Sequence, residues 1–393
     1  MNFKQAAADF LPQIQKWRRH IHQYPERSFK EKETTGYIEK ELRGMGISVT
    51  RFPDFYGLTA TIQGGKPGKT VLLRADIDAL GIRERNELPF CSVNDGVMHA
   101  CGHDCHSAML LGAAKLLSAC KEELCGTVKL LFQAAEESGH GANYYVEHGC
   151  LDDVDAAMAM HVMNEIPKGT FSIEAGPRMS SCTNFTLTVH GSSCHGSTPH
   201  LGHDAIVAAS AIIMNIQTLV SRENNPLHPL VVTIGSVRGG KQFNIVADKV
   251  IMEGTIRTFD PDVFASIPDR LEAMARLTAE SVGCTVSMEI DIREPAVIND
   301  KEEITALARN AAVSLYGESV LASMKRKMSS EDFAAIMQKV PGVLCFLGYH
   351  CEEEGAVYPL HSKDFRVNDE ILDRGSALFA RFAYDYLNKG GKS

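Results

Sequence analysis

Three apolar segments in the first half of the chain each run directly into acidic or imidazole side chains. The segments and the side chains that follow them are 71–75 before Asp76 and Asp78, 127–132 before Glu136 and Glu137, and 156–160 before His161. Continuous apolar strands that alternate with helices are typical of a mostly parallel sheet with helices on both faces. Ligands of such sheets bind beyond the carboxyl ends of the strands. The sequence therefore predicts an α/β domain that collects these side chains at one edge of its sheet.

The pattern of predicted elements changes near residue 180. Alternating apolar residues predict strands, and longer amphipathic stretches predict helices, in the order 185–189, 204–220, 230–237, 249–258, 261–282 and 288–292. Strand, helix, strand, strand, helix, strand is the order of a ferredoxin-like α+β unit. The helix–strand style of the first part resumes after Pro295. We therefore predict a discontinuous catalytic domain, residues 1–179 and 293–393, interrupted by an inserted lid or dimerisation domain at 180–292.

Charge and composition narrow the class of protein. The net charge of −9 argues against nucleic-acid binding, which needs a basic surface. The first residues lack the basic and then apolar order of a secretory signal, and the apolar stretch 205–216 is too short to cross a bilayer. The 11 cysteines are odd in number and scattered, which fits a reducing compartment better than a disulfide framework. We expect a cytoplasmic protein without nucleic-acid or membrane partners.

The segment 99–106 concentrates metal-ligating side chains, because only Ala100 and Gly102 within it lack one. Cys101 and His103 flank Gly102, whose backbone freedom allows a turn tight enough for both side chains to approach one metal ion. Thiolate and imidazole are the ligand types that zinc and its neighbours prefer. A structural Cys/His knuckle has the same composition, so this segment alone leaves both interpretations open.

The other candidate residues also have two interpretations each. Adjacent residues point in different directions, so one of Glu136 and Glu137 could bind metal while the other faces the substrate. An acidic surface loop is the alternative. His161 ends an apolar strand, where a hydrogen-bonded core histidine is as simple an interpretation as a metal ligand. His361 lies in a segment, 358–362, that could be a surface loop.

Together these segments resemble the dimetal aminoacylase and carboxypeptidase family. Within that family they resemble the amidohydrolase branch, which includes hippurate hydrolases, N-acyl-amino-acid amidohydrolases and auxin-conjugate hydrolases. The matching segments, in the family's order, are 74–80, 99–106, 136–138, 161–162, 194–200, 254–258, 330–333 and 360–362. The resemblance implies metal-dependent amide hydrolysis with two divalent ions per subunit. Zinc and manganese are the leading candidates, followed by nickel and cobalt.

The resemblance also implies which residues bind each of the two metal ions. It places Cys101 at a bridging position between the two ions. His103 and His161 would complete one site, and Glu137 and His361 would complete the other.

Further roles come from the same resemblance. Glu136 matches the general base, which takes a proton from a metal-activated water and passes it to the leaving amine. Asp78 matches a carboxylate that orients a metal-bound imidazole. His99 and His106 match positions beside the ligands or positions that are structural.

Three residues of the inserted domain are candidates for substrate contacts. His195 is expected to stabilise the oxyanion. Arg257 is expected to pair with a free substrate carboxylate, and Asn244 to hydrogen-bond the substrate. A solvated loop histidine, a surface arginine and a turn asparagine are the alternatives.

The expected substrate is therefore an N-acyl amino acid or a related conjugate with a free carboxylate. A dipeptidase or carboxypeptidase of the same family is the nearest alternative, and a catalytically silent binding paralogue is another. A thiol hydrolase that uses Cys101 or Cys105 would leave the glutamate pair without a role. Exposed sheet edges pair with other chains, and two-fold dimers are the commonest assemblies, so we expect a homodimer through the inserted domain.

Overall fold

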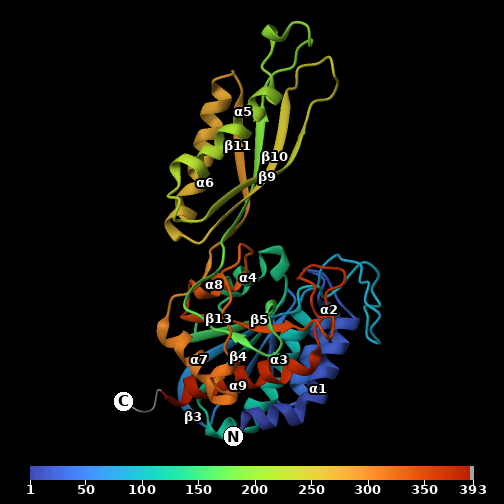
Figure 1. The fold of residues 1–393 in the computed structure, drawn as a ribbon, viewed down its shortest axis with the longest axis vertical. Helices are drawn as coiled ribbons and strands as arrows, with labels where there is room; N and C mark the ends of the chain where they lie inside the picture. Colours follow the sequence, from blue (N-terminus) through green and yellow to red (C-terminus); the bar gives the residue numbers. More distant parts are fainter. Residues whose placement is uncertain (390–393) are drawn as a thin grey trace. The chain divides into compact units, whose positions relative to one another are not determined.

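The computed structural model describes residues 1–389, and its internal contacts divide the chain into two units (Figure 1). Unit 1 comprises Met1–Arg178, Ile298–Lys325 and the residues from Asp332 onward. Unit 2 comprises Met179–Val297 and Arg326–Glu331.

The segment Arg326–Glu331 belongs to unit 2 and not, as the sequence pattern predicts, to the catalytic domain. Met179 forms a parallel bridge with Lys327, and the Ser180 hydroxyl donates to the Met328 carbonyl at 2.8 Å. These long-range backbone contacts leave no periodic pattern in the sequence.

Unit 1 is built on a seven-stranded sheet with the order β1-β2-β4-β3-β5-β13-β6. Its strands are β1 Ser48–Arg51, β2 Leu58–Gln63, β3 Lys66–Asp76, β4 Cys125–Gln133, β5 Ala156–Pro167, β6 Phe171–Ser172 and β13 Gly342–His350. The central strands β4, β3, β5 and β13 are parallel, and antiparallel strands flank them. The predicted α/β fold with a largely parallel central sheet is confirmed. Residues 70–76 of β3, 156–163 of β5 and 342–349 of β13 are continuously buried, which explains the unbroken apolar runs in these strands.

Helices cover both faces of this sheet, and Figure 1 shows α4 and α8 on one side and α1, α3, α7 and α9 on the other. The helices of unit 1 are α1 Phe3–Gln23, α2 Lys32–Gly44, α3 His103–Ala119, α4 Gly141–Glu147, α7 Glu302–Tyr316, α8 Phe333–Met337 and α9 Leu372–Lys389. Helix α3 packs against α1 and α9, which also contact each other, and against β3 and β5. This burial on several sides explains why residues 108–114 of the helix are all small or apolar.

Unit 2 is a four-stranded antiparallel sheet, with the order β11-β8-β10-β9, backed by two helices. Its elements, in chain order, are β8 Cys182–His190, α5 Ala205–Thr218, β9 Leu230–Gly239, β10 Lys249–Thr258, α6 Pro261–Glu280 and β11 Thr285–Glu294. Phe185, Leu187 and Val189 alternate along β8 and enter the core formed with α5 and α6. A short pair, β7 Gly176–Met179 with β12 Val297–Asn299, lies where the chain passes between the units.

The helix predicted at 204–220 begins as α5, Ala205–Thr218, and its helical continuation ends at Glu223. A π-helical turn, Leu219–Glu223, continues it, so that the 19 residues Ala205–Glu223, with a mean hydropathy of 1.4, are long and apolar enough to cross a membrane by length and composition. Ala208 and Ile212 nevertheless lie in the core of unit 2. The core helix of a folded domain can have the same length and apolar composition.

Candidate metal centre

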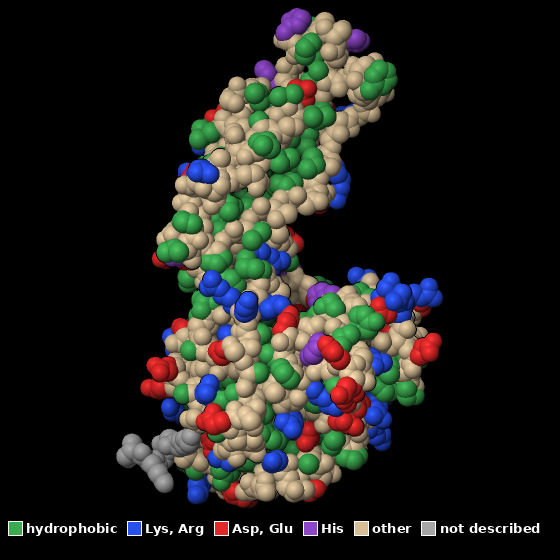
Figure 2. Space-filling model, in the orientation of Figure 1, with side chains coloured by type: hydrophobic (Ala, Val, Ile, Leu, Met, Phe, Trp, Pro, Cys, Tyr) green, Lys and Arg blue, Asp and Glu red, His purple; other side chains and the backbone are tan. Residues whose placement is uncertain are grey.

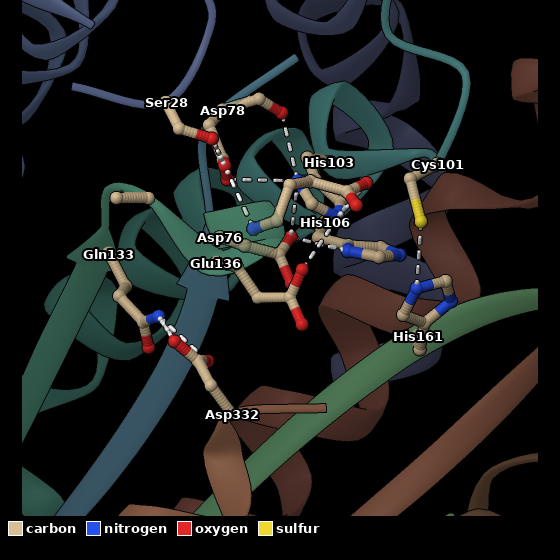
Figure 3. Close-up of polar contacts among 12 residues, drawn as sticks. Ser28, Asp76, Asp78, Cys101, His103, His106, Gln133, Glu136, His161 and Asp332 are labelled. Carbon is tan, nitrogen blue, oxygen red and sulfur yellow. Dashed lines mark hydrogen bonds and ion pairs between the residues drawn. The ribbon is translucent and has the colours of Figure 1, made fainter. Parts of the chain in front are cut away.

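The carboxyl ends of β4, β3 and β5 bring a group of acidic, thiol and imidazole side chains together in unit 1 (Figure 3). Asp76 ends β3, and His161 lies within β5 beyond the point where β3 pairs with it. Cys101 comes from the turn before α3, and His103 is the first residue of that helix. Because these three strands are neighbours in the sheet, residues distant in sequence meet at one edge.

The turn that carries Cys101 and His103 requires glycine between them. Gly102 has φ +88°, in the left-handed region, and a Cβ on it would lie 2.3 Å from the Val162 Cγ2 atom. Any other residue would therefore be strained and would collide with β5. Cys101 Sγ lies 3.5 Å from Nε2 of His161.

The ring of His103 is oriented by Asp78. Its Nδ1 lies 2.8 Å from the Asp78 carbonyl oxygen and 3.2 Å from the Asp78 carboxylate. A carbonyl only accepts, so Nδ1 carries a proton, and Nε2 is the nitrogen left to face the centre. Asp78 in turn accepts from the Ser28 hydroxyl at 2.7 Å and from the Glu137 N–H at 3.0 Å.

Glu137 and His361 meet on the more exposed side of the centre, where Glu137 Oε1 lies 3.4 Å from Nε2 of His361. Glu137 belongs to a single 3₁₀ turn after β4, Glu136–Ser138. His361 adopts φ +63°, and its N–H donates to the Ala100 carbonyl at 2.7 Å, which joins it to the Cys101 turn.

These side chains form two compact groups that share one residue. The ligand atoms of Cys101, His103 and His161 all lie within 4.8 Å of one another, and so do those of Cys101, Glu137 and His361. A shared thiol suits a ligand that bridges two ions. Among the residues that the structure describes, Nε2 of His103 and Oε1 of Glu137 are buried and find no hydrogen-bond partner, which is costly unless a cation engages them. The donor set of sulfur, nitrogen and oxygen fits zinc or a neighbouring divalent metal.

The electrostatics of the centre also favour a cation. Burial lowers the pKa of His103, but Asp76, Asp78 and Glu137 outweigh it and raise that pKa to about 10. Burial and the nearby glutamates raise the pKa of the Cys101 thiol well above its usual value. This thiol therefore needs a bound cation to ionise at neutral pH.

Glu136 lies against the same centre. Its Oε2 is 3.9 Å from Nε2 of His103, and its side chain is largely buried. Glu136, Glu137 and His103 form a further close group of possible ligand atoms. The structure therefore brings Glu136 beside the five residues that the sequence analysis proposed as ligands.

A buried ion network beneath the centre was not assigned a role from the sequence. The Arg74 guanidinium donates to Asp76 and Asp332, each at 2.7 Å, and to Gln133 at 2.8 Å. The Gln133 amide donates to both carboxylate oxygens of Asp332 (Figure 3). An arginine inside an apolar strand was the available signal, because such a charge is buried only with partners.

A second buried network joins α1 to the first turn of α3. Asp104 accepts from Arg18 at 2.7 Å and lies 2.8 Å from the His22 ring, whose other nitrogen is 3.2 Å from Glu84. Burial raises the pKa of Asp104, but Arg18 and His22 hold it well below its usual range. His99, beside this network, is fully buried, and burial lowers its pKa to about 3, so its ring is neutral.

The candidates from the inserted domain all lie in unit 2. His195 is exposed, and its Nδ1 accepts from the Ser197 N–H at 3.2 Å. Asn244 is in an adjoining segment, since its carbonyl accepts from the Gly196 N–H at 2.8 Å. Arg257 is on β10 and donates to the Ser330 hydroxyl at 2.9 Å.

Comparison with known proteins places this arrangement among metal-dependent hydrolases. Residues 72–385 match peptidase family M20/M25/M40. The chain is 40% identical to an N-acetyl-L-cysteine deacetylase of Bacillus subtilis, over 96% of this chain and 88% of that protein. It is 37% identical to the IAA-amino acid hydrolase ILR1-like 4 of Arabidopsis thaliana, over 96% and 87% of the two chains. Among solved structures, the YXEP protein of Bacillus subtilis, a dinuclear metal-binding peptidase of the M20 family, matches with a TM-score of 0.84 and 33% identity, over 96% and 99% of the chains.

Proposed function

This chain belongs to peptidase family M20/M25/M40 and is a hydrolase of that family, and we propose that it cleaves the amide bond of N-acyl amino acids that carry a free carboxylate. The observation that carries this proposal is the thiol of Cys101, which two close groups of ligand atoms share, with Glu136 beside them. The relatives whose names specify an N-acetylated amino acid and an amino-acid conjugate support the substrate class.

Each residue of the centre has a defined part in this proposal. Cys101, His103 and His161 would hold one divalent ion. Cys101, Glu137 and His361 would hold the other. Two bound ions would supply Lewis-acid polarisation of the amide carbonyl and a lowered pKa for the attacking water. Thiolate at the shared position favours zinc by softness, and manganese, nickel and cobalt remain the other candidates.

Glu136 is proposed as the general base. Its carboxylate accepts the proton of the attacking water and delivers it to the nitrogen of the leaving amine. The 3.9 Å separation between Glu136 and Nε2 of His103 supports this role, because it places the carboxylate beside a ligand position without making it part of either shared group. Asp78 orients His103 through the contacts described above.

Unit 2 is proposed as a lid that supplies contacts to the substrate. The Ser197 N–H donates to Nδ1 of His195, so the neutral ring carries its proton on Nε2, as an oxyanion donor requires. Arg257, oriented by Ser330, is proposed to pair with the substrate carboxylate, and Asn244 to hydrogen-bond the substrate.

Unit 2 is also proposed as the interface of a homodimer. Its sheet has β9 and β11 as edge strands, and exposed edges commonly pair with another chain. Figure 2 shows hydrophobic side chains gathered over this unit, and Ile206, Val207 and Met214 of α5 are among its exposed residues. Exposed apolar patches of this kind mark interfaces.

A cellular location and a small-molecule partner are proposed as well. All 11 cysteines are free thiols, which supports the proposed reducing, cytoplasmic location. The partner of the centre would be a small N-acyl amino acid or peptide. A catalytically silent paralogue is disfavoured because all five proposed ligands and Glu136 meet in one place.

A panel of substrates distinguishes the proposed activity from its nearest alternative. The metal-free protein is reconstituted separately with Zn²⁺, Mn²⁺, Ni²⁺ and Co²⁺, and each form is assayed on N-acyl amino acids and on free dipeptides. We expect metal-dependent hydrolysis of the N-acyl amino acids, with slower turnover of dipeptides. Faster turnover of dipeptides would favour a peptidase, and no hydrolysis with any metal would contradict the proposal.

A further inference from the structure

Strand β5 extends beyond the last of its residues that pair with β3, and this extension leads to the metal centre. The pairing ends at Arg74 with Ala159, whereas β5 continues through His161 to Pro167 along β13. Backbone N–H groups on the β3 side of this extension are buried and therefore need other partners. A side chain must replace the missing strand.

His106 supplies that partner for Val162. This histidine lies on α3, is fully buried, and its Nε2 is 2.9 Å from the Val162 N–H. The side chain of Val162 is held as well, because its Cγ2 packs on Gly102 in the Cys101 turn. Val162 is thus fixed from two sides.

The contacts of His106 decide where its proton lies. A backbone N–H only donates, so Nε2 of His106 accepts and carries no hydrogen. Nδ1 therefore bears the proton and donates to Asp76 Oδ1 at 2.6 Å. The second oxygen of Asp76 accepts from Arg74 at 2.7 Å. Both nitrogens of His106 are thereby used, so the close group Asp76–His103–His106 is not a metal site, although its atoms are near enough to form one.

Val162 also contacts His161, the proposed metal ligand that precedes it in the chain. Its carbonyl accepts from Nδ1 of His161 at 2.7 Å, which leaves the lone pair on Nε2 of His161, 3.5 Å from Cys101 Sγ (Figure 3). The N–H of Val162 is held by His106, and its carbonyl holds the ring of His161. We infer that His106 is a positioning residue that acts through the backbone of Val162 to aim Nε2 of His161 at the metal centre, with Asp76 setting the tautomer. This inference rests on the proposed function only in taking His161 as a ligand.

Two substitutions separate the contacts of His106. His106→Gln places an amide oxygen near the position of Nε2, where it can accept from Val162 but no longer pairs with Asp76. His106→Asn places its amide near the position of Nδ1, where it can donate to Asp76 but does not reach Val162. Both are made in a His361→Ala parent, so that only the group Cys101–His103–His161 is compared.

The readouts are Zn²⁺ affinity by chelator competition and the hydrogen-exchange rate of the Val162 amide, both without substrate. We expect His106→Asn to lose protection at Val162 and to bind zinc about 10–100-fold more weakly, the usual effect of removing a partner of a ligand. His106→Gln should keep the protection and a zinc affinity near that of the parent. Equal zinc affinities in the two variants would overturn the inference.

A measurement on the unaltered protein covers the case in which a variant fails to fold. The ¹⁵N imidazole spectrum of the metal-free protein should show His106 neutral, with its proton on Nδ1. A proton on Nε2 would overturn the inference. Neither experiment uses a substrate, so a failure to hydrolyse N-acyl amino acids would remove the proposed function and leave this result standing.

Discussion

The carboxylate of Glu31 accepts a hydrogen bond of 2.9 Å from the backbone N–H of Ala135. Ala135 has φ +60°, a strained conformation for a residue with a Cβ, and it directly precedes the turn that carries Glu136 and Glu137. The side chain of Glu31, at the start of α2, thus supports the backbone conformation that presents both glutamates to the metal centre.

This relationship predicts a pH dependence of stability. Burial, and then the charge of Asp78, raises the pKa of Glu31 from 4.5 to about 7. The folded protein therefore holds this proton more tightly than the unfolded chain does. Its contribution to stability is complete below the unfolded pKa and is lost as the pH rises through about 7. At roughly 1.4 kcal/mol per pKa unit, the loss amounts to about 3 kcal/mol.

Urea unfolding of the metal-free protein and of Glu31→Gln, at several pH values between about 4.5 and 8, measures this contribution. As the pH rises, the unfolding free energy of the unaltered protein should fall relative to that of Glu31→Gln. A difference that is independent of pH would contradict the raised pKa of Glu31.

Glu136→Gln should abolish most of the turnover and leave the metals in place. Glutamine cannot accept the proton of the attacking water, and general acid–base catalysis is worth about 10²–10⁴-fold in rate. Steady-state kinetics on the best N-acyl amino acid, together with elemental analysis, checks both parts. A variant that turns over at nearly the original rate would remove Glu136 from the role of base.

Cys101→Ala should lose metal at both groups, because its thiol belongs to each. Cys105→Ala is the matched control, since Cys105 is a buried thiol in the first turn of α3, four residues after Cys101, and belongs to none of the close groups found among the described residues. Metal content and activity should fall in the first variant and persist in the second. Chelation should also abolish activity, whereas a thiol hydrolase would survive it.

Breaking the buried network beneath the centre should be costly. Arg74→Ala removes the buried guanidinium that pairs with Asp76 and Asp332, and removal of one partner of such a pair costs about 3–5 kcal/mol. Arg85→Ala, which removes an exposed pair with Asp364, should cost less than about 1 kcal/mol. Chemical denaturation of both variants provides the comparison, and equal losses would show that the network contributes little.

Subunit exchange tests whether His195 acts on the centre of a second subunit. The inactive variants Glu136→Gln and His195→Ala are mixed under conditions that exchange subunits. If His195 acts across a dimer, each mixed dimer has one intact centre and activity returns. Confirmed exchange without recovery would exclude action in trans, and a monomer by light scattering would exclude the dimer.

The sequence predicts the central strands of unit 1 and the residues at their ends. Apolar runs such as 71–75 and 156–160 are visible because strands buried on both faces must be apolar throughout. Parallel strands place their carboxyl ends at one edge, so Asp76 and His161 are expected near each other before any coordinates are known. The same logic does not predict the placement of Arg326–Glu331 or the helical residues 221–223 after α5, because neither segment has a periodic signal.

Local pattern thus determined which chemical groups gather at the sheet edge, and tertiary structure decided which atom of each group is available. The orientation of His161 depends on β3 ending its pairing before β5 does, and on His106 occupying the vacated position. The proton on His106 depends in turn on Asp76, which is held by an arginine that also binds Asp332 from far along the chain. Hydrogen-bond direction is a property of neighbours in space, and sequence periodicity reports only the face of an element that is buried.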